Sequence, residues 1–336
     1  MPIPDAPATN IERVHTVVIG LDVLEESERY ADDLRLTRGD SIHERDIELH
    51  RENGFRGRTF SRHDDVSVKD RSVSVDGHDV VVRQFLPNEG ARGAYLHFHG
   101  GGWVFGSASI YDDELADLSH DLGIAVFSVD YRLAPEHPFP AAMDDAEIAA
   151  RWLLREGLEE LNVERAAIGG WSAGAHLAAI VLQRLRANEE SISFCAANLL
   201  YGIYDLSMTP SQRHGLNTPR LSRADLEWYY ELVLPLSKSE DRRAAENSPL
   251  YGDLAGMPPA RFAVGTLDPL FDDSVFMAER WAAAGSPTRL EIYAAGAHGF
   301  ARQQNGLGRL ARQHESEYLS AHFHTVAGDP RFGATK

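Results

Sequence analysis

One pentapeptide constrains the fold of this chain more than any other segment: residues 170–174 read Gly-Trp-Ser-Ala-Gly. It follows a short apolar run, 166–169, and precedes helix-forming residues with apolar positions at helical spacing, 173–185. This context predicts a sharp strand-to-helix turn that holds the serine in a strained conformation, with its Oγ above the sheet edge. Glycines on either side let the strand and the helix approach each other. We therefore expect Ser172 to be a nucleophile if the chain supplies its partners.

A second segment, 99–103, reads His-Gly-Gly-Gly-Trp and follows the strand-like alternating run 94–98. Consecutive glycines let the backbone fold back so that several N–H groups face one point. Acyl transfer needs such a point, because each donor aimed at the developing oxyanion lowers the barrier by about 3 kcal/mol. We expect the oxyanion hole to be formed by the amides of Gly101, Gly102 and Ala173. A phosphate loop is disfavoured, since no Lys-Ser/Thr pair follows the glycines.

Two strand-like runs downstream are each followed by a polar residue suited to catalysis. The run 261–265 leads to Asp268, and the run 289–293 leads to His298. The order serine, acid, histidine is that of the α/β-hydrolases. In this arrangement His298 would take the proton of Ser172, while Asp268 would hold the imidazole in the correct tautomer and stabilise its charged form.

At this point the chain resembles the hormone-sensitive-lipase-like family of esterases, in the branch with the H-G-G-G signature. Beside the glycine loop and the serine turn, it carries Tyr-Arg-Leu-Ala-Pro-Glu at 131–136, Asp-Pro-Leu-Phe-Asp at 268–272 and His-Gly-Phe at 298–300. The blocks occur in the family's order and span residues 94–300. The resemblance implies an α/β-hydrolase fold, with a mostly parallel eight-stranded sheet, helices on both faces and a helical cap.

The resemblance also implies that Asp268 is the triad acid and that Asp272 supports the loop geometry. Asp272 and Asp273 lie within a helical turn of it and remain alternatives for the acid. Among the histidines, His97 and His99 have a spacing that can bind zinc. We expect instead that His99 supports the glycine loop through a hydrogen bond and that His97 packs in the sheet, with no metal and no cofactor.

The serine turn departs from the family's G-D-S-A-G-G pattern at two positions. Trp171 replaces the acid, and Ala175 replaces the last glycine. The stretch also resembles that of kynurenine-formamidase-like hydrolases, which keeps an amide or formamide substrate open. We consider Trp103, Trp171 and Tyr204 as substrate-binding residues, with packing against the cap as the alternative for Trp171. The aromatic cluster at 228–230 favours a core position over a pocket lining.

The rhythm of strands and helices suggests a division of the chain. Residues 1–60 show no strand pattern and favour amphipathic helices, and residues 205–250 are a long insertion between two core strands. The resemblance implies that both segments form a cap over a core made of 61–204 and 251–330. Within the insertion, Ser222 is expected to cap a helix.

Composition narrows the class of partner. The formal net charge is −18, which disfavours nucleic acid, anionic membrane surfaces and polyanionic substrates as partners. Cys195 is the only cysteine, so an intramolecular disulfide is excluded. Neither a signal peptide nor a membrane-spanning segment is indicated, and a cytoplasmic protein is expected. Similar enzymes are commonly dimers, so a homodimer is among the states considered.

These observations favour a serine carboxylesterase that acts on small to medium uncharged acyl esters without a cofactor. An amidase or arylformamidase with the same triad is the alternative among enzymes. The alternative from another class is a non-catalytic ligand receptor on the same scaffold, such as the plant gibberellin receptor, which lacks the functional histidine. The intact block around His298 argues against the receptor.

Overall fold

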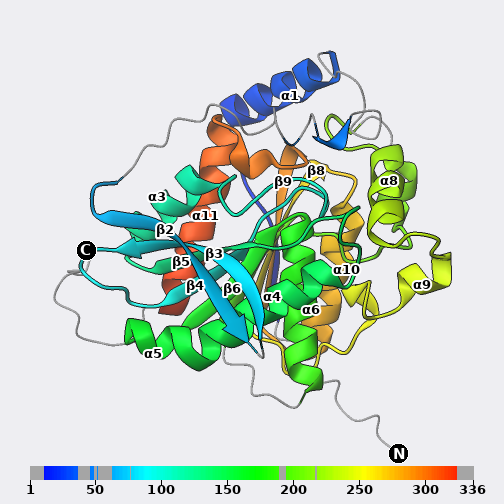
Figure 1. Ribbon diagram of the computed structural model, residues 1–336. Coiled ribbons are helices and arrows are strands. Elements are labelled where there is room, and N and C mark those ends of the chain that lie inside the picture. The colour runs from blue at the N-terminus through cyan, green and yellow to red at the C-terminus, as the bar shows by residue number, and fades with distance from the viewer. Residues whose placement is uncertain are drawn as a thin grey trace, which may run out of the picture.

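The computed structural model describes residues 11–36, 46–48, 51, 63–75, 77–188, 194–215 and 218–323 (Figure 1). Nine strands of this part of the chain form one sheet in the order β1-β9-β8-β7-β6-β4-β5-β3-β2. The strands are β1 (Ile11–Thr16), β2 (Val66–Val75), β3 (His78–Pro87), β4 (Ala94–Phe98), β5 (Ala125–Asp130), β6 (Ala166–Trp171), β7 (Phe194–Leu200), β8 (Ala260–Leu267) and β9 (Thr288–Ala297). Only the β2–β3 and β3–β5 pairs are antiparallel among them. The expected α/β-hydrolase fold is confirmed, with one strand more than the eight expected.

The additional strand is β1, at one edge of the sheet. It pairs in parallel with β9, and the amide of Val17 continues the ladder by donating to the carbonyl of Ile292 across 3.0 Å. The expectation that residues 1–60 contain no strand was therefore wrong. The segment Ile-Glu-Arg-Val-His-Thr has no two-residue alternation, and what makes it a strand is the free edge of β9, a contact between distant parts of the chain.

The residues at 66–75 and 80–86 alternate apolar with polar, with Asp76-Gly77 between them, which predicts an antiparallel hairpin. The structure confirms this hairpin at the other edge of the sheet. Strands β2 and β3 pair from Val66 with Pro87 to Val75 with His78, which leaves a two-residue turn. Gly77 in this turn has a φ of 82°, as a tight hairpin turn requires. Asp76, the other residue expected there, lies outside the described residues.

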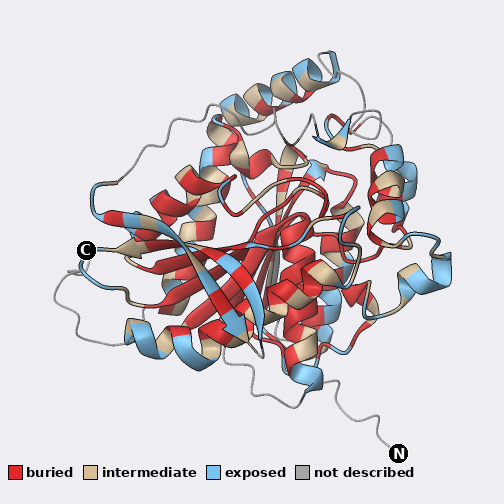
Figure 2. Ribbon diagram, viewed as in Figure 1, coloured by how far each residue is buried: buried red, intermediate tan, exposed pale blue. Residues whose placement is uncertain are grey.

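Helices cover both faces of the sheet, as expected, and Figure 2 shows the buried strands between half-exposed helices. On one face α3 contacts α11, and on the other α4 contacts α6, while α6 and α10 both contact the short helix η3. The helices of these layers are α3 (Asp112–Leu122), α4 (Ala141–Trp152), α5 (Leu158–Leu161), α6 (Ala173–Ala187), η3 (Pro249–Tyr251), α10 (Phe271–Ala283) and α11 (Gly306–Phe323). Near the N-terminus, α1 (Leu21–Leu36) contacts β9 and α11.

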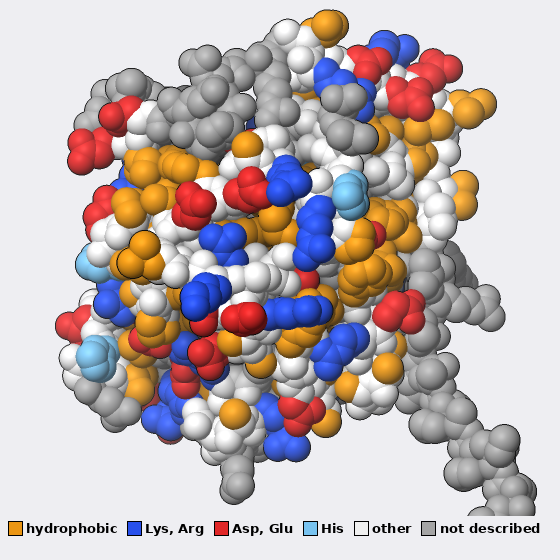
Figure 3. Space-filling model, turned by 90° about the vertical axis from the view of Figure 1, so that its right-hand side faces the viewer, with side chains coloured by type: hydrophobic (Ala, Val, Ile, Leu, Met, Phe, Trp, Pro, Cys, Tyr) orange, Lys and Arg blue, Asp and Glu red, His pale blue; other side chains and the backbone are white. Residues whose placement is uncertain are grey.

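The insertion between β7 and β8 contains α7 (Pro210–His214), α8 (Arg223–Val233) and α9 (Ser239–Arg243). Ser222 caps α8, as expected: its hydroxyl accepts a 3.2 Å hydrogen bond from the amide of Asp225, whose carboxylate accepts one of 2.9 Å from the amide of Ser222. This reciprocal capping box fixes where the helix begins. On the face of the molecule in Figure 3, acidic and basic side chains lie interspersed. None of the helices in the described ranges is long and apolar enough to cross a membrane.

Candidate active site

Ser172 lies in the turn between β6 and α6, with φ 58° and ψ −120°. Such a positive φ is strained for a serine, as expected for a nucleophile held above the sheet. Two close approaches explain the flanking glycines. A Cβ atom on Gly174 would lie 1.9 Å from the carbonyl oxygen of Phe98, and one on Gly170 would lie 2.5 Å from the backbone of Gly174. The turn therefore requires glycine at both positions.

The three residues proposed as a triad come together in one hydrogen-bonded chain. Ser172 Oγ lies 2.9 Å from His298 Nε2, and His298 Nδ1 lies 2.9 Å from Asp268 Oδ2. The acid and the histidine follow directly after β8 and β9, two neighbouring parallel strands that end at the same edge of the sheet. The carboxylate of Asp268 is fully buried and also accepts a 2.9 Å hydrogen bond from the amide of Leu270. It can therefore accept a hydrogen bond from Nδ1–H of His298, which leaves Nε2 to accept a hydrogen bond from the serine hydroxyl.

The structure separates Asp268 from its two rivals. Asp272 accepts a 2.7 Å hydrogen bond from the amide of Ser211, and no contact with His298 is seen in the described structure. Asp273 faces the insertion and accepts hydrogen bonds of 2.6 to 3.0 Å from Tyr204 N, Asp205 N, Thr209 Oγ1 and Gln212 Nε2. Burial, only partly offset by these donors, raises the pKa of Asp273 to about 7. Both rivals therefore connect the insertion to α10 instead of orienting the histidine.

The glycine loop after β4 passes beside the nucleophile. A Cβ atom added to Gly100 would lie 3.4 Å from Ser172 Cβ, while Gly101 and Gly102 have φ values of 123° and 61°. Within the described residues, no carbonyl or side chain accepts from the amides of Gly101, Gly102 or Ala173. These three donors are thus available to a ligand, which is what an oxyanion hole requires.

His99 supports this loop, as expected. Its Nδ1–H donates a 2.8 Å hydrogen bond to the carbonyl of Gly100, and its ring stacks on Tyr131 with centroids 4.1 Å apart. The Tyr131 hydroxyl in turn donates to the carbonyl of His99 across 2.7 Å. Burial lowers the pKa of His99 to about 4, so the ring is neutral. His97 is fully buried in β4 and packs edge-on against Trp171, also as expected.

Three aromatic residues considered for substrate binding are not brought to the surface around the serine. Trp103 is buried between Phe139 and His176, at centroid distances of 5.4 and 5.0 Å. Tyr204 is buried against Phe262. Both rings fill space in the protein interior. The direction in which each ring points depends on the residues that pack around it.

Trp171, the third of these, turns toward the layer formed by α3 and α11. Its side chain is only 2% exposed and packs against Tyr111, and its Nε1–H donates a 3.3 Å hydrogen bond to Glu315 Oε1. Side chains of successive residues in a strand point to opposite faces of the sheet. The indole can therefore point away from the nucleophile, although the two residues are adjacent in the sequence. Its ring and hydrogen-bond partners are His97, Tyr111 and Glu315, and within the described structure none of these belongs to 1–60 or 205–250.

Two residues near the site were not among the expected site residues. Tyr229 of α8 covers the glycine loop, since a Cβ atom on Gly102 would lie 2.3 Å from its ring. Glu315 of α11 is buried beneath Trp171. A signal for Glu315 exists in the sequence: it occupies the same helical face as buried Leu319, where a charged residue is unusual.

An elbow serine followed by an acid and a histidine on neighbouring parallel strands makes this protein an α/β-hydrolase. Residues 95–302 match the family described as alpha/beta hydrolase fold. The chain is 35% identical over 245 residues to an ethyl acetate hydrolase of Pseudomonas putida, covering 70% of this chain and 76% of that protein. It is 30% identical over 261 residues to an acetyl esterase of Salmonella typhi, covering 76% and 80% respectively.

Among solved structures, an esterase of Pyrobaculum calidifontis is similar, with a TM-score of 0.76 and 28% identity over 87% of this chain and 97% of that one. The chain belongs to the hormone-sensitive-lipase-like family of α/β-hydrolase esterases. It is a carboxylic ester hydrolase of the serine type.

Proposed function

We propose that this enzyme hydrolyses small to medium uncharged acyl esters, with Ser172 as the nucleophile, His298 as the general base and Asp268 as the residue that orients and stabilises the imidazole. The observation that carries the proposal is the unbroken hydrogen-bonded chain through these three residues, with contacts of 2.9 Å at both links. A serine hydrogen-bonded to a histidine that is in turn hydrogen-bonded to a buried acid is the arrangement that activates a hydroxyl for attack on a carbonyl.

In the first half of the reaction, Ser172 Oγ attacks the ester carbonyl as its proton passes to His298 Nε2. The tetrahedral intermediate collapses when the imidazolium donates this proton to the departing alkoxide, which leaves as an alcohol. In the second half, water gives a proton to the same nitrogen and attacks the carbonyl carbon of the acyl-enzyme. The imidazolium then returns this proton to Ser172 Oγ as the bond between Oγ and the acyl carbon breaks, which releases a carboxylic acid and the free serine. Asp268 stabilises the imidazolium that forms in each half.

The amides of Gly101, Gly102 and Ala173 are the proposed donors to the oxyanion. Ala173 follows the serine in the sequence, and Gly101 and Gly102 follow Gly100, whose added Cβ would lie 3.4 Å from Ser172 Cβ. None of the three amides is engaged by another group of the described structure. Donors held in place by positive φ angles and by the hydrogen bond from His99 need no reorganisation when the charge develops.

The preference for small uncharged esters rests on two observations. The relatives are named for ethyl acetate and for acetyl esters, and the net charge of −18 opposes anionic substrates. We further propose that 1–60 and 205–250 cap a core of 61–204 and 251–330. Tyr229 against the glycine loop supports this division, as do the 2.8 and 2.7 Å hydrogen bonds from Arg51 to the carbonyls of Val104 and Ala134.

Cytoplasmic action is part of the proposal, supported by the single cysteine, Cys195, which excludes an internal disulfide. A homodimer is the proposed assembly, by similarity to enzymes of the family. Sedimentation velocity at several protein concentrations tests the assembly, and a monomer at all of them would contradict it.

Labelling with a fluorophosphonate tests the nucleophile. Wild-type protein and the Ser109→Ala variant, which lacks an exposed serine, should both be labelled, while Ser172→Ala should not be. Labelling of Ser172→Ala would overturn the assignment. Assays on p-nitrophenyl acetate, longer p-nitrophenyl esters and N-formylkynurenine then define the substrate. If N-formylkynurenine is turned over faster than every ester, then the reaction to assign is formamide hydrolysis and not ester hydrolysis.

A further inference from the structure

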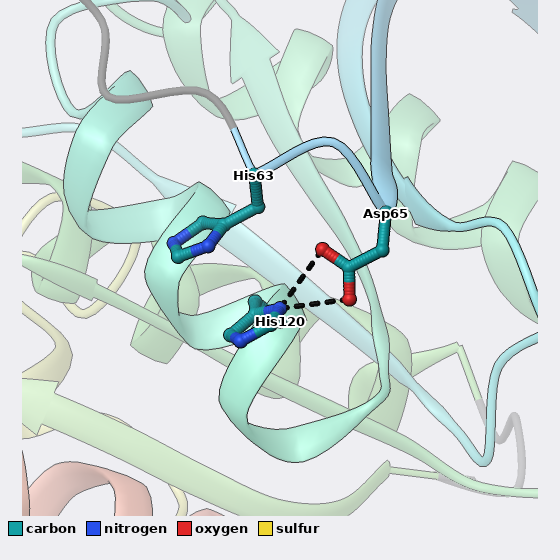
Figure 4. A group of neighbouring side chains, drawn as sticks. All are labelled: His63, Asp65 and His120. Atoms are coloured by element: carbon teal, nitrogen blue, oxygen red, sulfur yellow. Dashed lines mark hydrogen bonds and ion pairs between the residues drawn. The ribbon is translucent and has the colours of Figure 1, made fainter.

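A cluster of two histidines and two carboxylates lies on the surface where α3 meets the turn before β2. Figure 4 shows three of its members, His63, Asp65 and His120. His63 and Asp65 belong to the turn, and Asp117 and His120 occupy α3 one helical turn apart. Ligand atoms of His63, Asp65 and His120 all lie within 4.8 Å of one another. The two imidazoles stack with centroids 4.1 Å apart and an angle of 6° between their planes.

Each imidazole of the cluster has its own carboxylate. His120 Nδ1 lies 2.8 and 2.9 Å from the two carboxylate oxygens of Asp65, and His63 Nε2 lies 2.7 Å from Asp117 Oδ1. A histidine that binds a metal ion usually donates its other ring N–H to a carboxylate, which fixes the tautomer and the ring orientation. Asp117 does this for His63 and leaves its Nδ1 without a partner among the described residues.

The backbone that carries these side chains is anchored. The carbonyl of His63 accepts a 3.0 Å hydrogen bond from the amide of Val66, and the carbonyl of Asp65 accepts one of 2.8 Å from the amide of Asn88. The other two residues belong to a regular helix whose opposite face is buried. The cluster is therefore held by two ordered segments, although the side chains of His63 and His120 remain 26% and 40% exposed and can be reached from solvent.

We propose that this cluster binds one divalent transition-metal ion of the Zn²⁺ class. His63, His120 and Asp65 are the ligands, water completes the coordination, and Asp117 orients His63. Two imidazoles with one carboxylate suit Zn²⁺, whereas Mg²⁺ and Ca²⁺ prefer sites made of oxygen ligands. The ion takes the place of the proton between His120 and Asp65. The nitrogens of two stacked rings point in parallel directions and do not converge on one ion. One of the two exposed rings therefore turns when the ion binds.

The bound ion would connect two segments that are 55 residues apart in the sequence. It would therefore stabilise the native state by mass action, since the unfolded chain does not hold these ligands together. None of the four residues belongs to the triad or the glycine loop. No step of ester hydrolysis involves the ion, and the site is structural.

Zinc titration of untagged protein against a competing fluorescent zinc indicator tests the proposal. We expect one Zn²⁺ per chain, no competition from Mg²⁺, and an affinity that falls by on the order of 100-fold in His63→Ala and in His120→Ala. Asp117→Asn, which removes only the orienting carboxylate, should weaken binding by about 10- to 100-fold. His78→Ala is the matched control, because it removes an exposed histidine at the far end of the β2–β3 hairpin.

Thermal unfolding with and without zinc supplies a second readout. Zinc should raise the unfolding midpoint of wild type and of His78→Ala but not that of His120→Ala, and equal midpoints without zinc show that the variants fold. Ser172→Ala should bind zinc like wild type, so this result is independent of the esterase proposal. Equal zinc affinity in wild type, His63→Ala and His120→Ala, or no stoichiometric binding by wild type, overturns the site.

Discussion

The indole Nε1 of Trp171 donates a 3.3 Å hydrogen bond to Glu315, which ties the residue before the nucleophile to the C-terminal helix α11. Glu315 also accepts a 2.6 Å hydrogen bond from Asn198 of β7, and burial raises the pKa of its carboxyl group. The G-D-S-A-G-G pattern that the serine turn resembles has an acid at the position of Trp171. In this chain Trp171 ends strand β6 and supplies a donor, and the carboxylate beside it comes from α11.

Replacing Trp171 with phenylalanine is expected to lower the free energy of unfolding by about 1–3 kcal/mol, because Glu315 loses a buried donor. It should also lower kcat/KM for p-nitrophenyl acetate by about tenfold, since the elbow that positions Ser172 loses its anchor. Trp281→Phe is the matched control: it removes a 2.9 Å hydrogen bond to the carbonyl of Pro258, remote from the elbow. Denaturant unfolding and steady-state kinetics of both variants check this. Equal kcat/KM in the two would contradict a positioning role.

The assignment of the triad acid is tested by exchanging carboxylates for amides. Asp268→Asn is expected to reduce kcat on the order of 10⁴-fold, because the amide favours the wrong tautomer of His298. Asp272→Asn should keep kcat close to that of wild type, since its carboxylate contacts the amide of Ser211 and not the histidine. If single-turnover rates show the reverse order, then Asp268 is not the acid.

The contact between α8 and the glycine loop predicts the effect of a methyl group at Gly102. Gly102→Ala should lower kcat/KM at least tenfold, because its φ of 61° is strained for alanine and its Cβ would lie 2.3 Å from the ring of Tyr229. Adding Tyr229→Ala removes the clash but not the strain, so the double variant should recover part of the loss. Gly285→Ala, with φ 98° and open space around the Cβ, should leave kcat/KM unchanged. An additive double variant would show that the ring does not limit the loop.

The buried carboxyl of Asp273 predicts a pH dependence of stability. Its pKa in the folded protein is about 7, whereas an unfolded aspartate titrates near about 4. The folded state thus holds the proton more tightly, so this contribution is complete below about pH 4 and is lost as the pH rises to about 7. The difference in unfolding free energy between wild type and Asp273→Asn should fall over this range and level off above it. Urea unfolding at several pH values measures it, and a constant difference would contradict the raised pKa.

Much of the fold followed from local patterns. The hairpin was predicted because alternating residues on both sides of Gly77 indicate the pairing directly, and the start of α8 followed from the capping residue Ser222. The edge strand β1 escaped prediction, because Ile11–Thr16 is a strand only through its contact with β9, which lies more than 270 residues away in the chain.

The same distinction between local patterns and contacts of distant segments applies to the active site. Ser172, Asp268 and His298 could be selected from the sequence, since each follows a strand pattern and carries the chemistry of acyl transfer in its own side chain. The directions in which the side chains of Trp103, Trp171 and Tyr204 point could not be predicted from such local patterns. An aromatic ring packs wherever the helices and strands leave room for it, and that room is set by residues from distant parts of the chain.

The sequence by itself determined the class of fold, the order of the catalytic residues and the position of the serine turn, because turns, strand alternation and glycine requirements are properties of neighbouring residues. Only the tertiary structure decided between Asp268 and Asp273, placed Glu315 beneath Trp171 and joined His63 to His120. Each of these depends on two side chains that meet after the sheet and its helices have packed, and no local pattern records such a meeting.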